Sequence, residues 1–213
     1  MAAAIIPRKG EVAYICPMFE VGRLQERIIV GETVRGWEEH ESPYDLVVAM
    51  LKDMGIEKGQ LGIGEETRFF LVDGIRKAAP HIDLVSADPI TAECRIIKSL
   101  RELELMQHAS DITMAAYKET VKHIELGMRG SDINDLSRQA HAALGVSGSL
   151  GTMLGVVSSS PHGSIVEPLL EEGMIVLMDG GCNVHNYASD ISRTFVFGNH
   201  TAEQEEVWKL EKA

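Results

Sequence analysis

The stretch MIVLMDGGCNVHNYASDISRTFVFG, residues 174–198, decides how this chain folds. Its first part is a nearly continuous apolar run that ends in Asp179, which is the pattern of a buried strand that delivers an acid to a site. The second part, residues 187–197, reads as another strand and places Asp190 and Ser192 on one face. The two parts predict an antiparallel β-hairpin with an acid on each strand.

The register of this hairpin determines how close the two acids come. If its centre lies between Val184 and His185, Asp179 and Asp190 are directly opposite each other, and their Cβ atoms are roughly 4.5 to 5.5 Å apart. Two carboxylates at that distance repel each other, and burying them without a partner is costly. We therefore expect a cation between them, and a divalent metal ion is the natural candidate.

A purely structural role for the same acids is the alternative. In that interpretation Asp179 caps the turn through the glycines that follow it, and Asp190 pairs with Arg193 or with another cation. Aspartates in turns are common, so an isolated pair would favour this alternative. The apolar residues that flank these two weaken it.

The stretch also resembles the metal-binding hairpin of the pita-bread metallopeptidase family, which includes prolidase, aminopeptidase P and methionine aminopeptidase. That family's pattern is an Asp-Gly pair at the end of a strand, ten residues between two aspartates, and a Ser-Asp-Ile-Ser/Thr-Arg-Thr run. Asp179-Gly180 and residues 189–194 match every element. The resemblance implies that Asp179 chelates one metal ion and that Asp190 bridges two.

Two further motifs extend the resemblance upstream. Pro161-His162 matches a Pro-His loop of the family, which implies that His162 contacts the substrate and transfers protons. Lys98-Ser99 with Glu102 matches the start of the catalytic domain in the prolidase and aminopeptidase P branch, and the serine and the glutamate have the spacing of a helix capping box. Methionine aminopeptidases usually lack the domain that precedes this start, so the longer branch fits better.

The activity implied by the resemblance is hydrolysis of an Xaa-Pro peptide bond, as a dipeptidase or an aminopeptidase. The substrate is then a peptide or dipeptide with proline at its second position. The nucleophile is a hydroxide that bridges two metal ions, which lower the pKa of water and polarise the carbonyl. Oxygen-rich ligands suit manganese best, with cobalt or zinc as the other candidates.

The predicted fold is α/β (α+β) with two domains. Residues 1–90 are expected to form part of a creatinase/prolidase-like amino-terminal domain, and residues 95–213 the first half of a pita-bread catalytic domain. The step Asp88-Pro89 marks the predicted change between them. The family completes its site with one histidine and two glutamates on later strands, so we expect the chain to be truncated at both ends and inactive alone.

The charge and composition of the chain limit the classes of partner that it can bind. The formal net charge of −12 and the lack of a basic cluster argue against nucleic acid and anionic membranes. The three cysteines are far apart in the sequence and do not have the spacing of a metal-binding motif. The apolar run at the amino terminus is too short for a signal peptide. We therefore expect a cytoplasmic protein, and we expect it to be a homodimer.

Two other functions stay open. A creatinase-like amidinohydrolase would use the same fold without metal, although the presence of both Asp179 and Asp190 argues against it. A pseudo-peptidase would keep the fold as a non-catalytic interaction module. Replacement of the downstream histidine and glutamates would favour the second function.

Overall fold

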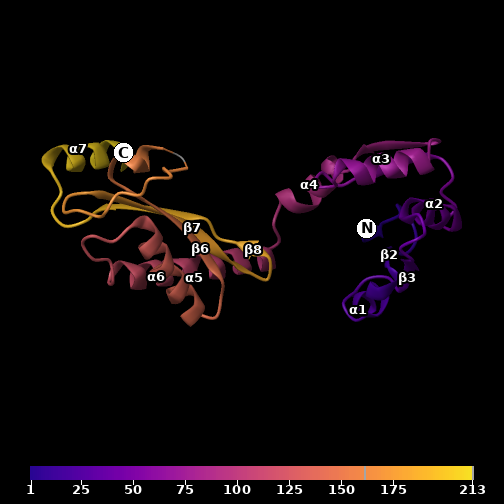
Figure 1. The fold of residues 1–213 in the computed structure, drawn as a ribbon, viewed down its shortest axis with the longest axis horizontal. Coiled ribbons are helices and arrows are strands. Elements are labelled where there is room, and N and C mark those ends of the chain that lie inside the picture. Colours follow the sequence, from indigo (N-terminus) through magenta and orange to yellow (C-terminus); the bar gives the residue numbers. More distant parts are fainter. Residues whose placement is uncertain (161, 213) are drawn as a thin grey trace. The chain divides into compact units, whose positions relative to one another are not determined.

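The computed structural model describes residues 1–160 and 162–212 and divides the chain into two compact units, Met1–Ile97 and Lys98–Ala213 (Figure 1). Each unit combines helices with strands, which confirms the predicted α/β class. The step Asp88-Pro89 lies within the first unit, where it opens a helix. Proline is well suited to the first turn of a helix because the N–H it lacks would have no partner there.

The first unit contains two small sheets. Strand β1 pairs antiparallel with β2, and β2 pairs parallel with β3, while β4 and β5 form a separate parallel pair. Helix α2 begins with an N-cap, in which the hydroxyl of Ser42 accepts a hydrogen bond from the backbone N–H of Asp45. The elements are β1 (Ala3–Ile5), β2 (Ala13–Pro17), η1 (Met18–Glu20), α1 (Val21–Gln25), β3 (Thr33–Trp37), α2 (Pro43–Asp53), β4 (Gly59–Ile63), α3 (Phe69–Ala78), β5 (Ile82–Ser86) and α4 (Asp88–Ile96).

The second unit is a helix layer against a sheet. Strand β7 lies in the middle of this sheet, with β6 along one edge and β8 and β9 along the other. Helices α5 and α6 lie together on one side of the sheet (Figure 1). The elements are α5 (Leu100–Val121), α6 (Gly130–Ala143), β6 (Gly148–Leu154), η2 (Gly155–Ser159), β7 (Ile175–Val184), β8 (Tyr187–Ala188), β9 (Ile191–Val196) and α7 (Ala202–Lys212).

Helix α5 is 22 residues long, and the capping box that the sequence predicts at its start is present. The hydroxyl of Ser99 accepts from the backbone N–H of Glu102, and the Glu102 carboxylate accepts from the backbone N–H of Ser99. Leu103, near the start of this helix, is 50% exposed. The buried face is formed by smaller and more polar residues, namely Ala109, Thr113, Ala116, Tyr117 and Thr120.

No helix in the described part of the chain is both long enough and apolar enough to cross a membrane. The cysteines are all free, and Cys16 and Cys182 are buried while Cys94 is exposed.

Candidate metal centre

The turn between β7 and β8 fixes the register of the hairpin. Val184 pairs with Tyr187, so the turn consists of the two residues His185 and Asn186. Both have positive φ angles, 48° and 68°, as the central residues of a type I′ turn require. The centre of the hairpin therefore lies between His185 and Asn186, one residue beyond the predicted position.

The predicted direct opposition of Asp179 and Asp190 is therefore wrong. Asp179 pairs with Ser192 in the ladder between β7 and β9. Asp190 comes two positions before Ser192, so it is a diagonal neighbour of Asp179 rather than its direct partner. Such diagonal neighbours in a regular ladder lie roughly 7 to 8 Å apart. Because side chains alternate between faces with a period of two, a displacement of two positions still leaves both aspartates on one face of the sheet.

The aspartates lie on the face of the sheet opposite α5 and α6. Met178 and Cys182 are buried, and the Cys182 thiol donates a hydrogen bond of 3.4 Å to the carbonyl oxygen of Ala109 on α5. Asp179 follows Met178 in the strand and points the other way, where it is half-buried. Asp190 is exposed. The two carboxylates are thus open to a ligand on that face.

The polar partners of the two acids differ. The Ser192 hydroxyl donates a hydrogen bond of 2.5 Å to Oδ1 of Asp179. Within residues 1–160 and 162–212, Asp190 has neither a hydrogen bond nor an ion pair, and the Arg193 guanidinium donates instead to the carbonyl oxygen of Ser192 at 2.7 Å. Asp179 also lies inside β7 rather than in the turn. The purely structural alternative for the two acids is therefore not what the structure shows.

The carboxylates of Asp179 and Asp190 both affect the pKa of the Tyr117 hydroxyl. Burial raises the pKa of Tyr117 most, and the negative charges of Asp179 and Asp190 raise it further, while Arg193 lowers it. Tyr117 lies on α5, and its hydroxyl donates to the carbonyl oxygen of Ile191 at 3.0 Å. The two acids consequently share one electrostatic environment around the β7–β9 ladder.

The donor chemistry of this pair fits a divalent cation. Carboxylate oxygens are the ligands that manganese, magnesium and calcium prefer, and Asp190 forms no ion pair among the described residues. The set is small, because no group of three histidine, cysteine, aspartate or glutamate side chains in that part of the chain is arranged to hold a metal ion. Asp179 and Asp190 can therefore supply part of a coordination sphere.

The predicted catalytic histidine lies in a turn after η2. His162 is exposed, and the backbone N–H of Gly163 donates to the carbonyl oxygen of Ser160 at 3.0 Å. Gly163 lies against Met153 of β6, since a Cβ atom added to it would stand 3.1 Å from Cγ of that methionine. Pro161, the other half of the predicted Pro-His motif, lies outside the described residues. The structure gives no contact between His162 and either aspartate.

Helix α5 contributes polar side chains that the sequence did not single out. Thr113 and Tyr117 contact the strand on either side of Asp190, through Ser189 and Ile191. The available signal was their spacing, because residues four apart lie on the same face of a helix. Their partners are more than seventy residues away in sequence.

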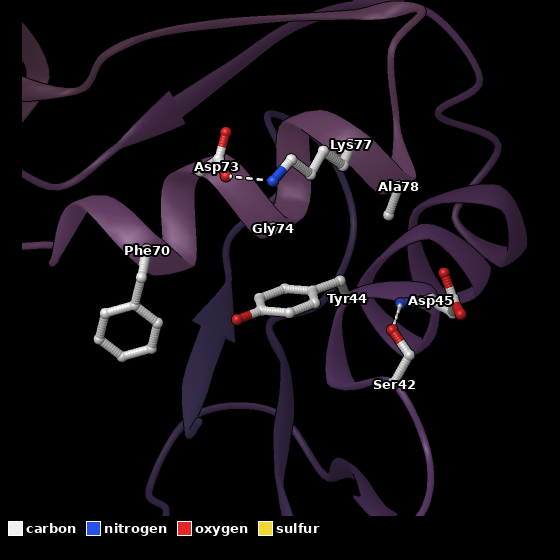
Figure 2. A pocket seen from close by; sticks show the side chains of 8 residues that line it. All are labelled: Ser42, Tyr44, Asp45, Phe70, Asp73, Gly74, Lys77 and Ala78. Carbon is white, nitrogen blue, oxygen red and sulfur yellow. Dashed lines mark hydrogen bonds and ion pairs between the residues drawn. The ribbon is translucent and has the colours of Figure 1, made fainter.

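A hollow lies in the first unit, between α2 and α3, with a volume of about 430 Å³ (Figure 2). Its charged pair is already satisfied, because the Lys77 ammonium lies 2.7 Å from the Asp73 carboxylate. The ring of Tyr44 lies against Gly74, where any Cβ atom would come within 2.3 Å of it. This hollow thus reflects close packing of a ring on a helix, and it presents no cluster of reactive groups.

The start of α5 is connected to the hairpin through Glu102. The hydroxyl of Tyr187 on β8 donates to the Glu102 carboxylate at 2.8 Å, and the backbone N–H of Ser99 donates to its other oxygen at 2.6 Å. Hydrogen bonds from the backbone and side chain of Ser99, and then from Tyr187, lower the pKa of Glu102 from 4.5 to about 2.

This shift predicts an acid-sensitive contribution to stability. A carboxylate whose pKa is lower in the folded state stabilises the fold above its unfolded pKa, and that contribution disappears as the pH falls from about 4.5 to about 2. Glu102→Gln should therefore be less stable than the wild type at pH 6, and the difference should shrink toward pH 2. Urea unfolding of both proteins at a series of pH values measures this difference in the free energy of unfolding. Tyr187→Phe, which keeps the capping box, should show a smaller effect, and a difference independent of pH for Glu102→Gln would contradict the assignment.

Comparison with known protein families shows to which family this chain belongs. Residues 104–213 match metallopeptidase family M24, and residues 1–97 match the creatinase/prolidase N-terminal domain. The chain belongs to metallopeptidase family M24. The M24 match covers α5 from residue 104 onward and the hairpin with both aspartates, and the resemblance inferred from the sequence is confirmed.

Several individual proteins are similar to this chain. An uncharacterized peptidase of Schizosaccharomyces pombe is 27% identical over 216 residues, which is 96% of this chain and 46% of that protein. The Xaa-Pro dipeptidase from Bacillus anthracis has a TM-score of 0.84 at 21% identity, covering 99% of this chain and 58% of its own. The X-Pro aminopeptidase from Thermotoga maritima has a TM-score of 0.77 at 22% identity, covering 95% and 57%.

The structural likenesses establish the fold, and this M24 chain spans about half the length of the proteins it matches. The family is one of metallopeptidases, so bound divalent metal ions belong to its chemistry.

Proposed function

We propose that the full-length protein is a metal-dependent peptidase that cleaves Xaa-Pro bonds, either as a dipeptidase or as an aminopeptidase. The observation that supports it is the placement of Asp179 and Asp190 on one face of one hairpin, with no ion pair on Asp190 in the described residues. The similar fold of a protein named as an Xaa-Pro dipeptidase and of one named as an X-Pro aminopeptidase supports both forms of the activity.

The residues of this chain would have distinct roles. Asp179, steadied by the hydroxyl of Ser192, would chelate one metal ion, and Asp190 would bridge two. When bound, the two cations would lower the pKa of water and polarise the scissile carbonyl. His162, in the exposed turn after η2, would contact the peptide and transfer protons. Oxygen donors favour manganese, with cobalt or zinc as alternatives.

Hydrolysis of Ala-Pro and of a longer Xaa-Pro peptide by the full-length protein tests the proposal. We expect no turnover after treatment with a chelator and recovery when Mn²⁺ is added. Cleavage of the dipeptide alone would favour a dipeptidase, and cleavage of the longer peptide an aminopeptidase. Creatine serves as the contrasting substrate, because its metal-independent hydrolysis would favour the amidinohydrolase. Absence of both metal binding and hydrolysis would favour the pseudo-peptidase.

The assembly and location of the protein remain part of this proposal. We expect a cytoplasmic homodimer, and light scattering of the full-length protein at several concentrations measures the oligomeric state.

A further inference from the structure

The strand around Asp190 lacks the continuous ladder that holds the rest of the hairpin. Strand β8 ends at Ala188 and β9 begins at Ile191, so Ser189 and Asp190 lie between two paired segments. Asp190 itself has no hydrogen bond or ion pair within the described part of the chain. The direction of its carboxylate is consequently set by the backbone of its two neighbours.

Ser189 is fixed by a buried polar network below the sheet. Its hydroxyl lies 2.8 Å from the hydroxyl of Thr113 on α5 and accepts a hydrogen bond of 3.0 Å from the backbone N–H of Cys182. Its backbone N–H donates to the carbonyl oxygen of Cys182 at 2.9 Å. Thr113 is completely buried, and Cys182 and Ser189 nearly so. Water therefore does not replace these contacts.

Ile191, the other neighbour, is fixed from the same helix. The hydroxyl of Tyr117 donates to the carbonyl oxygen of Ile191 at 3.0 Å. Tyr117 comes four residues after Thr113, so both side chains leave the same face of α5. This helix is 22 residues long and begins with a complete capping box, which makes it a rigid support.

We propose that Thr113 and Tyr117 are positioning residues that clamp Ser189 and Ile191 and thereby aim the Asp190 carboxylate at the cation. The clamp holds the chain on both sides of the ligand, through the side-chain hydroxyl of Ser189 and the backbone carbonyl oxygen of Ile191, from the opposite face of the sheet. Partners outside the immediate ligand set typically change metal affinity by roughly 10- to 100-fold when they are removed. This inference rests on the proposed function, because it assigns a role toward the metal that Asp190 would hold.

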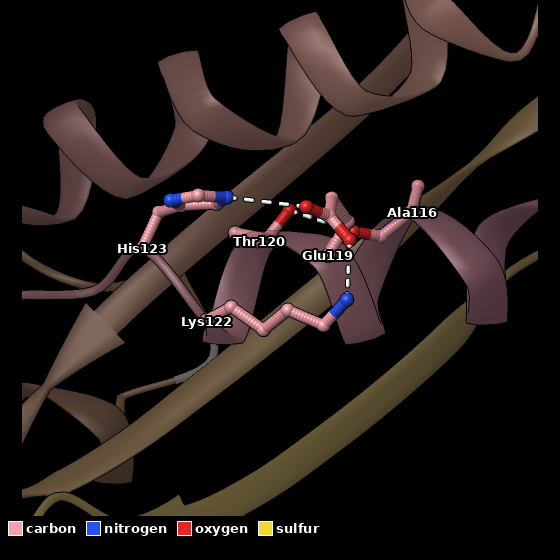
Figure 3. Close-up of polar contacts among 5 residues, drawn as sticks. All are labelled: Ala116, Glu119, Thr120, Lys122 and His123. Carbon is pink, nitrogen blue, oxygen red and sulfur yellow. Dashed lines mark hydrogen bonds and ion pairs between the residues drawn. The ribbon is translucent and has the colours of Figure 1, made fainter.

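A matched control exists on the same helix. Thr120 is as buried as Thr113, but its hydroxyl donates at 2.8 Å to the carbonyl oxygen of Ala116 in its own helix (Figure 3). Thr120→Val and Thr113→Val thus remove the same group from the same buried face, but only the Thr113 hydroxyl hydrogen-bonds to the hairpin among the described residues. Thr113→Ser retains the hydroxyl and serves as the conservative variant.

The test measures Mn²⁺ affinity by calorimetry and thermal unfolding without metal, both on the full-length protein. We expect Thr113→Val and Tyr117→Phe each to bind Mn²⁺ about tenfold more weakly, and Thr113→Ser and Thr120→Val to bind it as the wild type does. Hydrogen exchange at the Ser189 amide should be faster in Thr113→Val than in Thr120→Val. These two results together support the clamp.

Several results would overturn it. If Thr113→Val loses thermal stability as Thr120→Val does but keeps wild-type Mn²⁺ affinity, the network is structural only. An affinity loss in Thr120→Val equal to that in Thr113→Val would also overturn it, since general destabilisation would then explain both. A wild type that binds no Mn²⁺ refutes the proposed function together with the clamp, whereas a wild type that binds Mn²⁺ with unaffected variants refutes the clamp alone.

Discussion

Asp190→Ala is expected to abolish both metal binding and peptide hydrolysis in the full-length protein. The loss should exceed the roughly 100-fold that removal of an outer partner costs, because Asp190 would contact both cations directly. The apo fold should be unaffected or slightly more stable, since Asp190 is exposed and its charge faces another acid. Function and folding are therefore separable at this position.

Thermal unfolding with and without Mn²⁺ measures this separation. A ligand that binds only the folded state stabilises it by about 2.7 kcal/mol at a hundred times its dissociation constant. The wild type should show this gain, and Asp190→Ala should show none. Asp111→Ala removes an exposed acid of α5 whose carboxylate, among the described residues, accepts a hydrogen bond only from Gln107, and this variant should respond to Mn²⁺ as the wild type does. Unchanged turnover in Asp190→Ala would refute the site.

The sequence predicts the elements that carry the site but not their register. The apolar run before Asp179 and the capping box at Ser99 each correspond to one element of the structure. The prediction of the hairpin register was wrong because the centre of the turn lies between His185 and Asn186 and not between Val184 and His185. This one-residue displacement of the centre shifts the pairing of the strands by two residues. Such a shift keeps every side chain on its face, so the pattern of polar and apolar residues does not distinguish the two registers.

Backbone conformation supplies the missing information about the turn. The structure places His185 and Asn186 at positive φ, and asparagine is one of the few residues other than glycine that tolerates it. The glycines at 180 and 181 are the more obvious turn residues in the sequence, yet both lie inside β7. They serve close contact between strands rather than chain reversal.

The hydrogen bonds of Thr113 and Tyr117 beside Asp190 could not be predicted from sequence patterns, for a different reason. A threonine on the buried face of a helix reads as a weak helix former until its partner is known. The partner of Thr113 is Ser189, which is brought near only when the hairpin packs on α5. The same applies to Tyr117, whose hydroxyl binds a backbone carbonyl that no side-chain pattern reveals.

Gly181→Ala is expected to destabilise the second unit strongly and to displace Asp190. Gly181 faces the gap between β8 and β9, and a Cβ atom added there would stand 2.0 Å from the carbonyl oxygen of Ser189 and 2.8 Å from its hydroxyl. Backbone atoms cannot rotate away as a flexible side chain can, so the strand itself must move. Overpacking of this kind costs about 1 to 3 kcal/mol.

Gly151→Ala on the neighbouring strand β6 is the matched control for this change. Gly151 is exposed and pairs with Asp179, and its added Cβ atom would have only an ordinary contact of 3.7 Å with the Asp179 carbonyl oxygen. Its free energy of unfolding should stay within about 0.5 kcal/mol of the wild type. Gly181→Ala should also weaken Mn²⁺ binding, because the strand segment that must yield carries the ligand. Equal stabilities of the two variants would show that β7 and the Ser189 segment are not in tight contact, and the support proposed for Asp190 would then lose its structural basis.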